Sequence, residues 1–140
     1  MAFTLDPRLA ADCSIIGSNE QSLLLLMEDS RYPWFIVVPK IEGACEWFDL
    51  THEDQLRLHQ DCVALGHSVK QAYACEKINI AALGNIVRQL HIHVVGRETT
   101  DPAWPGPVWG HSPAIRYTDE TRQERINRLY GQDKLPFNTT

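Results

Sequence analysis

The chain has 140 residues, of which 44% are hydrophobic and 22% are charged, so its length and composition fit one globular domain with a buried core. Its net charge of -5, with only 13 lysine and arginine residues, gives no basic stripe for the backbone of a nucleic acid. Polymeric DNA and RNA are therefore excluded as expected partners. A small anionic ligand is not excluded, because it needs only a few N–H or cationic groups.

The cysteines and the apolar segments exclude further classes of protein. The four cysteines are scattered and form no C-x-x-C pair, which is typical neither of a zinc ribbon nor of a disulfide scaffold. No apolar run approaches the length of a membrane span, and the first residues lack the pattern of a signal peptide. We therefore expect a cytoplasmic protein with reduced cysteines and no membrane partner.

The first half of the chain predicts a short helix, a hairpin and a long helix. An aspartate followed by proline predicts a short helix over residues 7–12. Two apolar runs, at 22–27 and 34–38, flank a polar segment and predict a β-hairpin covered on both faces. Thr51 precedes acidic residues and predicts a helix start, and apolar spacings of three and four carry this helix to about Tyr73.

The second half predicts two strands, an irregular segment and a last helix. Residues 77–83 and 89–96 have the composition of strands, and the short link between them predicts antiparallel neighbours. Residues 101–110 are too rich in proline and glycine for regular structure. Thr118 predicts the start of a helix that ends near Tyr130. Strands and helices in this order predict an α+β fold.

The segment Gln-Leu-His-Ile-His-Val-Val, residues 89–95, carries the strongest functional signal. Side chains alternate along a strand, so Gln89, His91 and His93 are expected on one face, with apolar residues on the other. Neighbours on one face lie about 6.5 Å apart, which lets two imidazoles address one phosphoryl group or one metal ion.

Two kinds of chemistry fit this pair of histidines. A zinc or iron site needs a third ligand, for which Glu42, His67 and His111 are available but have no diagnostic spacing. A neutral imidazole is also a nucleophile toward phosphorus, and a second imidazole can act as an acid or a hydrogen-bond donor near neutral pH. The turn Gly84-Asn85 can expose backbone N–H groups to phosphate oxygens. The residues alone leave both kinds of chemistry open.

The same segment resembles the signature of the HIT (histidine triad) family, His-φ-His-φ-His-φ-φ with φ apolar, with Gln89 at the first histidine. Residues 35–40, Phe-Ile-Val-Val-Pro-Lys, resemble the family's hairpin strand, and the order of hairpin, helix, strand and histidine strand also matches. The resemblance is strongest over residues 15–98. It implies that residues 1–140 form one HIT-like α+β domain, with an antiparallel sheet of about five strands, a long helix and short flanking helices. Such domains are usually homodimers.

The resemblance also implies an activity and roles for the histidines. Family members are nucleotide hydrolases or nucleotidyl transferases that cleave phosphoanhydride or phosphoramidate esters of nucleoside monophosphates, such as diadenosine polyphosphates or AMP conjugates. His91 would attack the α-phosphate and form a nucleotidyl-histidine intermediate, and His93 would contact the phosphate oxygens and the leaving group. No cofactor and no protein-bound metal are implied, although a divalent cation can accompany a polyphosphate substrate.

Three departures from the family pattern affect this transfer of roles. Gln89 cannot carry a proton or a positive charge, although its amide can donate a hydrogen bond. Glu42 lies nearest to the position where many members have a histidine, and is a candidate to orient a catalytic imidazole. The phosphate loop is shortened to residues 82–87, in which Gly84 and Asn85 remain candidate phosphate ligands. An alternative is therefore a nucleotide-binding module without turnover, and a metal-dependent enzyme is a further alternative.

Other positions are assigned by the resemblance to substrate binding. Glu28 or Asp29 falls where the family places an acidic residue on the ribose hydroxyls, and Asn79 is expected to line the site. Trp104 and Trp109 belong to the proline-rich segment, for which the family pattern has no match. They either cover the site or anchor their own loop.

Overall fold

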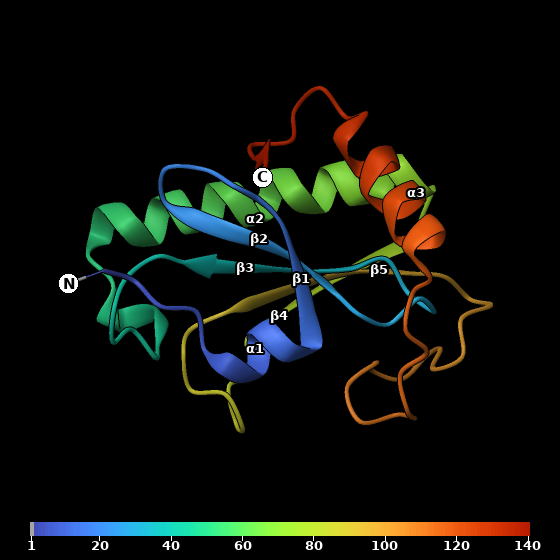
Figure 1. Ribbon diagram of the computed structural model, residues 1–140, viewed down its shortest axis with the longest axis horizontal. Coiled ribbons are helices and arrows are strands. Elements are labelled where there is room, and N and C mark those ends of the chain that lie inside the picture. The colour runs from blue at the N-terminus through green and yellow to red at the C-terminus, as the bar shows by residue number, and fades with distance from the viewer. Residues whose placement is uncertain (1) are drawn as a thin grey trace.

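The computed structural model describes residues 2–140, which contain one antiparallel sheet of six strands in the order β4-β5-β3-β2-β1-β6 (Figure 1). The strands are β1 Cys13–Ser18, β2 Ser22–Met27, β3 Trp34–Pro39, β4 Lys77–Ala81, β5 Ile92–Arg97 and β6 Asn138–Thr139. The helices are α1 Pro7–Asp12, α2 His52–Tyr73 and α3 Asp119–Tyr130, and the 3-10 turn η1 is Trp47–Asp49. The α+β fold is confirmed, with six strands instead of about five.

The three α-helices begin where the sequence predicts, because each has a polar N-cap. The side chains of Asp6, Thr51 and Thr118 each accept a hydrogen bond from a backbone N–H in the first turn of their helix. At the other end of α2, Ala74 adopts a left-handed conformation with φ of 52°, which ends the helix. Among residues 2–140, no helix has both the length and the apolar character that crossing a membrane requires.

The strands differ from the sequence prediction in two ways: two strands are additional, and the predicted strands 77–83 and 89–96 are shorter or begin later. β1 and β6 are not predicted, because their short, partly polar segments become strands only by pairing with β2 and with each other. The strand predicted from Gln89 begins instead at Ile92. The cause is local, since the backbone N–H of Leu90 donates to the carbonyl of Ala44, outside the sheet. Gln89 and His91 therefore precede the strand and lie in its entry loop.

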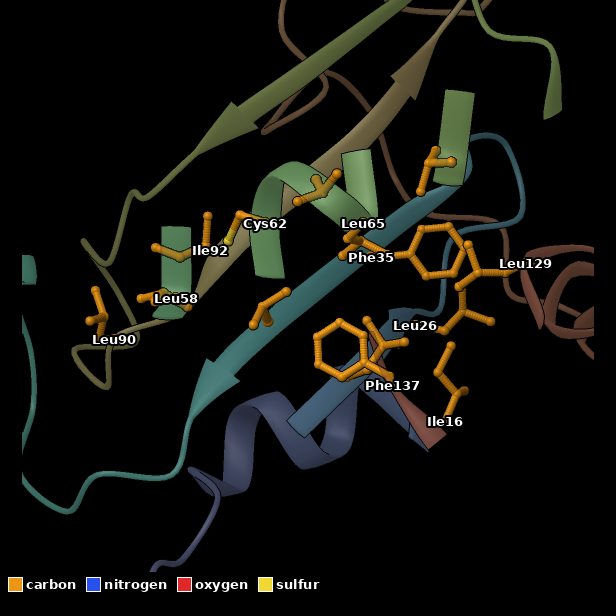
Figure 2. Close-up of a cluster of buried hydrophobic side chains, with 14 of the residues drawn as sticks. Ile16, Leu26, Phe35, Leu58, Cys62, Leu65, Leu90, Ile92, Leu129 and Phe137 are labelled. Atoms are coloured by element: carbon orange, nitrogen blue, oxygen red, sulfur yellow. The ribbon is translucent and has the colours of Figure 1, made fainter. Parts of the chain in front are cut away.

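The sheet is buried on both faces along β2 and β3, as predicted. One face packs against α2: Figure 2 shows Leu58, Cys62 and Leu65 of this helix gathered over Phe35 and Ile92. The opposite face packs against α1 and the proline-rich segment, and its buried residues include Leu9, Trp34, Ile36, Val95, Ala103 and Val108. Because residues alternate along β5, His93 lies on this second face.

Arg97 at the end of β5 holds the proline-rich segment on the sheet. Its side chain is 2% exposed, and its guanidinium donates to both carboxylate oxygens of Asp101, at 2.8 and 3.0 Å. It also donates to the carbonyl of Gly106 and to the side-chain oxygen of Asn79, each at 2.8 Å. The segment therefore has no regular structure, as predicted, but it is fixed by a buried ion pair.

Candidate functional site

A cleft of about 430 Å³ opens beside the two histidines. Its walls come from α1, from the start of β3, from the loop before β5 and from the proline-rich segment. The lining residues are Arg8, Leu9, Asp12, Met27, Trp34, Leu83, Gly84, Asn85, Ile86, Val87, His91, His93, Trp109 and Gly110. A cavity of about 490 Å³ beside α3 contains neither histidine. Most of the cleft wall is apolar, and the two imidazoles lie within it.

The ring of His91 is fixed by the backbone of the residue two positions before it. Its Nδ1 lies 2.7 Å from the carbonyl oxygen of Gln89. A carbonyl oxygen only accepts hydrogen bonds, so Nδ1 carries the proton and donates it. In the neutral ring, the other nitrogen, Nε2, then keeps its lone pair. His91 is therefore oriented as a nucleophile or base.

The ring of His93 has the opposite tautomer. The indole Nε1–H of Trp34 donates to Nδ1 of His93 at 3.0 Å, so the proton of the neutral imidazole is on Nε2. The His91 and His93 ring centroids are 5.0 Å apart. Burial, and secondly the nearby His91, lowers the pKa of His93 from an ordinary 6.5 to about 3. His93 is therefore a neutral hydrogen-bond donor at physiological pH.

The buried neutral His93 predicts a pH dependence of stability. Its pKa is lower in the folded state, so its contribution is fully present above about pH 6.5 and is lost as the pH falls toward 3. The free energy of unfolding is expected to fall by about 1.4 kcal/mol per pH unit from this group. Urea unfolding between pH 7 and 4 measures the slope. His93→Gln, whose side-chain oxygen can still accept from Trp34, is expected to have a shallower slope, and an unchanged slope would contradict this assignment.

Two tryptophans enclose His93. Trp109 lies 5.3 Å from the His93 ring and 5.9 Å from Trp34, in both cases nearly perpendicular. Trp104 instead lies against Arg97, whose guanidinium carbon is 5.7 Å from the centre of its ring. The sequence left two roles open for Trp104 and Trp109. In the structure, Trp109 covers the cleft and Trp104 anchors the loop.

The amide of Gln89 is turned away from the imidazoles. Its Nε2 donates to the carbonyl of Thr4 at 2.9 Å, and its Oε1 accepts from the N–H of Asp6 at 2.8 Å. Both hydrogen-bonding functions are therefore used by the N-terminal segment.

The comparisons with known proteins agree with this geometry. The model of the HIT domain matches residues 8–100. A crystal structure of a histidine triad protein from Sinorhizobium meliloti 1021 has 44% identity, covers 92% of this chain and 96% of that chain, and has a TM-score of 0.90. The chain belongs to the HIT family. Proteins of the HIT family bind nucleotides and are generally hydrolases or transferases.

Two further HIT structures are similar over nearly their whole length. The histidine triad protein from Bradyrhizobium japonicum has 37% identity, covers 96% of this chain and 99% of that chain, and has a TM-score of 0.92. The one from Marinobacter aquaeolei VT8 has 41% identity, covers 94% and 96%, and has a TM-score of 0.91. The chain matches no curated protein.

The acidic pair assigned by the HIT resemblance to ribose is engaged with arginines. Glu28 is 3% exposed and accepts from Arg122 of α3 at 2.7 and 2.9 Å. The hydrogen bonds from Arg122, and secondly from Ser14, lower the pKa of this carboxyl below its ordinary value, although burial acts in the opposite direction. Asp29 is 2% exposed and pairs with Arg31 at 2.9 Å. Contact of either carboxylate with ribose stays a prediction. Glu28 thus ties α3 to the end of β2, whereas Asp29 pairs with Arg31 inside the hairpin turn.

The remaining predicted residues of the HIT site divide between the cleft and its surroundings. Gly84 and Asn85 line the cleft, and Gly84 has a φ of 70°, which favours glycine. Asn79 is not among the residues that line the cleft, and its side-chain oxygen accepts from Arg97. Glu42 is exposed, and within residues 2–140 it has no hydrogen bond to either imidazole.

Several lining residues were missed by the sequence argument. Trp34 and Met27 were assigned only to strands, and Arg8 and Asp12 only to a minor helix. An i, i+4 pair of opposite charges on a short helix was the available signal for the latter two.

The described residues contain no group of three or more histidine, cysteine, aspartate or glutamate side chains that could share a metal ion. The third ligand that a metal site requires is therefore not found among them.

Proposed function

We propose that the protein is a nucleotide hydrolase or nucleotidyl transferase that cleaves phosphoanhydride or phosphoramidate derivatives of nucleoside monophosphates. The observation that carries the proposal is the pair of opposite tautomers. His91 presents the lone pair of Nε2, and His93 presents an Nε2–H donor, with ring centroids 5.0 Å apart in one cleft. This is the pair of functions that attack on a phosphoryl group requires.

In the proposed reaction, Nε2 of His91 attacks the α-phosphorus of a bound nucleotide. The bond from phosphorus to the leaving group breaks as the bond to nitrogen forms, and the leaving group takes the electron pair. The positive charge on the His91 ring is stabilised because Nδ1–H already donates to the carbonyl of Gln89. Water, or another acceptor, then displaces His91 from phosphorus and releases the nucleoside monophosphate.

His93 supports this reaction as a donor to a phosphate oxygen. Because its pKa is about 3, its neutral ring has no labile extra proton to give to a leaving group near pH 7. Leaving groups that are stable as anions, such as phosphate or a nucleotide, are therefore favoured over amines. Within the proposed substrates, a neutral His93 favours phosphoanhydrides, including the diadenosine polyphosphate type, over phosphoramidates.

The apolar walls of the cleft support a nucleoside as the group that is bound. Leu83 and Ile86 are 42% and 72% exposed beside the histidines and offer surface to a base. Asp12 of α1 and Asn85 of the loop before β5 also line the cleft, and they offer an acceptor and an amide for sugar or phosphate groups.

A covalent intermediate on His91 is the direct test. Incubation with a dinucleoside polyphosphate, followed by rapid denaturation at neutral or alkaline pH and mass spectrometry, is expected to show a nucleotidyl group on His91. Release of nucleoside monophosphate without any label on His91, in native protein sampled before steady state, would contradict the proposed intermediate. Tight AMP binding, with no products released from a dinucleoside polyphosphate or from an AMP phosphoramidate, would favour the nucleotide-binding module. The observation that supports this alternative is the amide of Gln89, which donates to Thr4.

We also propose that the domain is a cytoplasmic homodimer. The four cysteines lie in the described part of the chain and are unpaired there, as in a reducing compartment. The strand β4 is an open edge of the sheet, with Ile80 49% exposed, and Leu56 and Val63 on the neighbouring α2 are 58% and 53% exposed. Light scattering is expected to give twice the 15.9 kDa of one chain, and a monomer mass at micromolar concentration would contradict the dimer.

A further inference from the structure

The N-terminal arm, residues 4–12, is bound to the loop before β5 by a side chain at a triad position. In an extended segment, the carbonyl of Thr4 and the N–H of Asp6 point to the same side of Leu5, which is how a backbone presents itself to a neighbouring strand. The planar amide of Gln89 meets both groups, at 2.9 and 2.8 Å. The side-chain amide of Gln89 thus pairs with the arm as the backbone of a neighbouring strand would, with one donated and one accepted hydrogen bond. A histidine cannot do this, because its donor and acceptor nitrogens point in divergent directions.

The position of α1 depends on this contact. The helix has six residues, too few to be stable alone, and it follows directly after Asp6. The carboxylate of Asp6 caps the helix by accepting from the N–H of Arg8 at 2.8 Å, while its own N–H is held by Gln89. Leu9, 4% exposed, packs in the same cluster as Trp34. Gln89 and Leu9 together hold α1 against the rim of the cleft.

The arm brings a positive charge to the cleft. Arg8 is the only arginine or lysine among the described residues that line the cleft, and a guanidinium stays charged at every physiological pH. Arg8 and Asp12, four residues apart, lie on one side of α1 and form no salt bridge within residues 2–140. The guanidinium of Arg8 is therefore available to an anionic ligand.

We infer that Gln89 is a positioning residue, which latches the N-terminal arm over the cleft so that Arg8 binds the phosphate groups of the leaving part of a nucleotide substrate. The inference rests on the proposed function and deepens it. A fixed guanidinium stabilises a departing polyphosphate by charge, which compensates for the absence of a proton donor at the first triad position.

Equilibrium binding of ATP and AMP, measured by calorimetry, tests the inference without requiring turnover. Arg8→Ala is expected to weaken ATP binding about tenfold and AMP binding much less, because AMP lacks the outer phosphates. Gln89→Ala is expected to weaken ATP binding similarly and to speed hydrogen exchange in the arm. The matched control is Arg88→Ala, which removes an exposed arginine that does not line the cleft, and it should bind ATP as the native chain does.

The double variant Arg8→Ala/Gln89→Ala separates positioning from general damage. If Gln89 acts through Arg8, the second substitution adds no further loss, so the dissociation constant of ATP in the double variant is no larger than in the single variant with the larger loss. Each of three outcomes would overturn the inference. Arg8→Ala could bind ATP as the native chain does, the losses could add in the double variant, or the native chain could bind ATP no more tightly than AMP. If the variants bind ATP as expected but no nucleotidyl group forms on His91, the inference stands and the proposed reaction is refuted. Nucleotidyl-His91 with full ATP binding in Arg8→Ala would refute the inference alone.

Discussion

His91→Asn is expected to lower kcat for a dinucleoside polyphosphate by about a thousandfold or more, because it removes the attacking nitrogen of the covalent step. Asparagine is the informative replacement, since its side-chain amide can still donate to the carbonyl of Gln89, which His91 contacts at 2.7 Å. The loop before β5 should therefore keep its conformation. Steady-state and single-turnover rates of nucleoside monophosphate release measure the effect, and AMP binding should change by much less than kcat.

The control for this variant is His111→Asn. His111 is exposed and is not among the residues that line the cleft, so its loss is expected to leave kcat unchanged. Native kcat in His91→Asn would remove His91 from the chemistry. An equal loss in both variants would show that the assay responds to something other than the attacking nitrogen.

Arg97→Ala is expected to lower the free energy of unfolding by about 3–5 kcal/mol, the range found when one partner of a buried ion pair is removed. The side chains of Arg97 and Asp101 are 2% and 8% exposed, so the variant leaves a buried carboxylate without its partner. The carbonyl of Gly106 and the side chain of Asn79 also lose a donor. Urea unfolding at pH 7 measures the change.

The matched control is Arg57→Ala, which removes an arginine with a 42% exposed side chain and salt-bridge distances of 3.9 and 4.0 Å. Its loss is expected to cost less than about 1 kcal/mol. The double variant Arg97→Met/Asp101→Leu removes both charges and should recover part of the stability lost in Arg97→Ala. A loss as small as that of Arg57→Ala would show that the proline-rich segment is held by other contacts.

The parts of the fold that the sequence predicts are those set by neighbouring residues. The caps at Thr51 and Thr118, and the apolar spacing along α2, act within a few positions, and these helices begin and end where expected. β1 and β6 depend on partners far away in the sequence, such as the pairing of Gly17 with Thr139. The entry of β5 is similar, because Gln89 contacts a residue 85 positions away.

The same division applies to the candidate site. The two histidines are visible in the sequence because their spacing of two places them together locally. Their tautomers are not visible, since Trp34 reaches His93 only through the antiparallel register of β3 and β5, in which Trp34 pairs with Val95. The engagement of Glu28 with Arg122, 94 positions away, likewise required the tertiary structure.

The two edges of the sheet differ in a way that limits how copies of the chain can associate. At one edge, β6 has two residues, so it offers little backbone to a partner strand. At the other edge, β4 offers five residues. A copy that adds to β4 through its own β4 leaves no equivalent edge open, so growth stops at a closed, two-fold pair. Because β6 has only two residues, the opposite edge of the sheet gives such a pair little backbone on which to extend further.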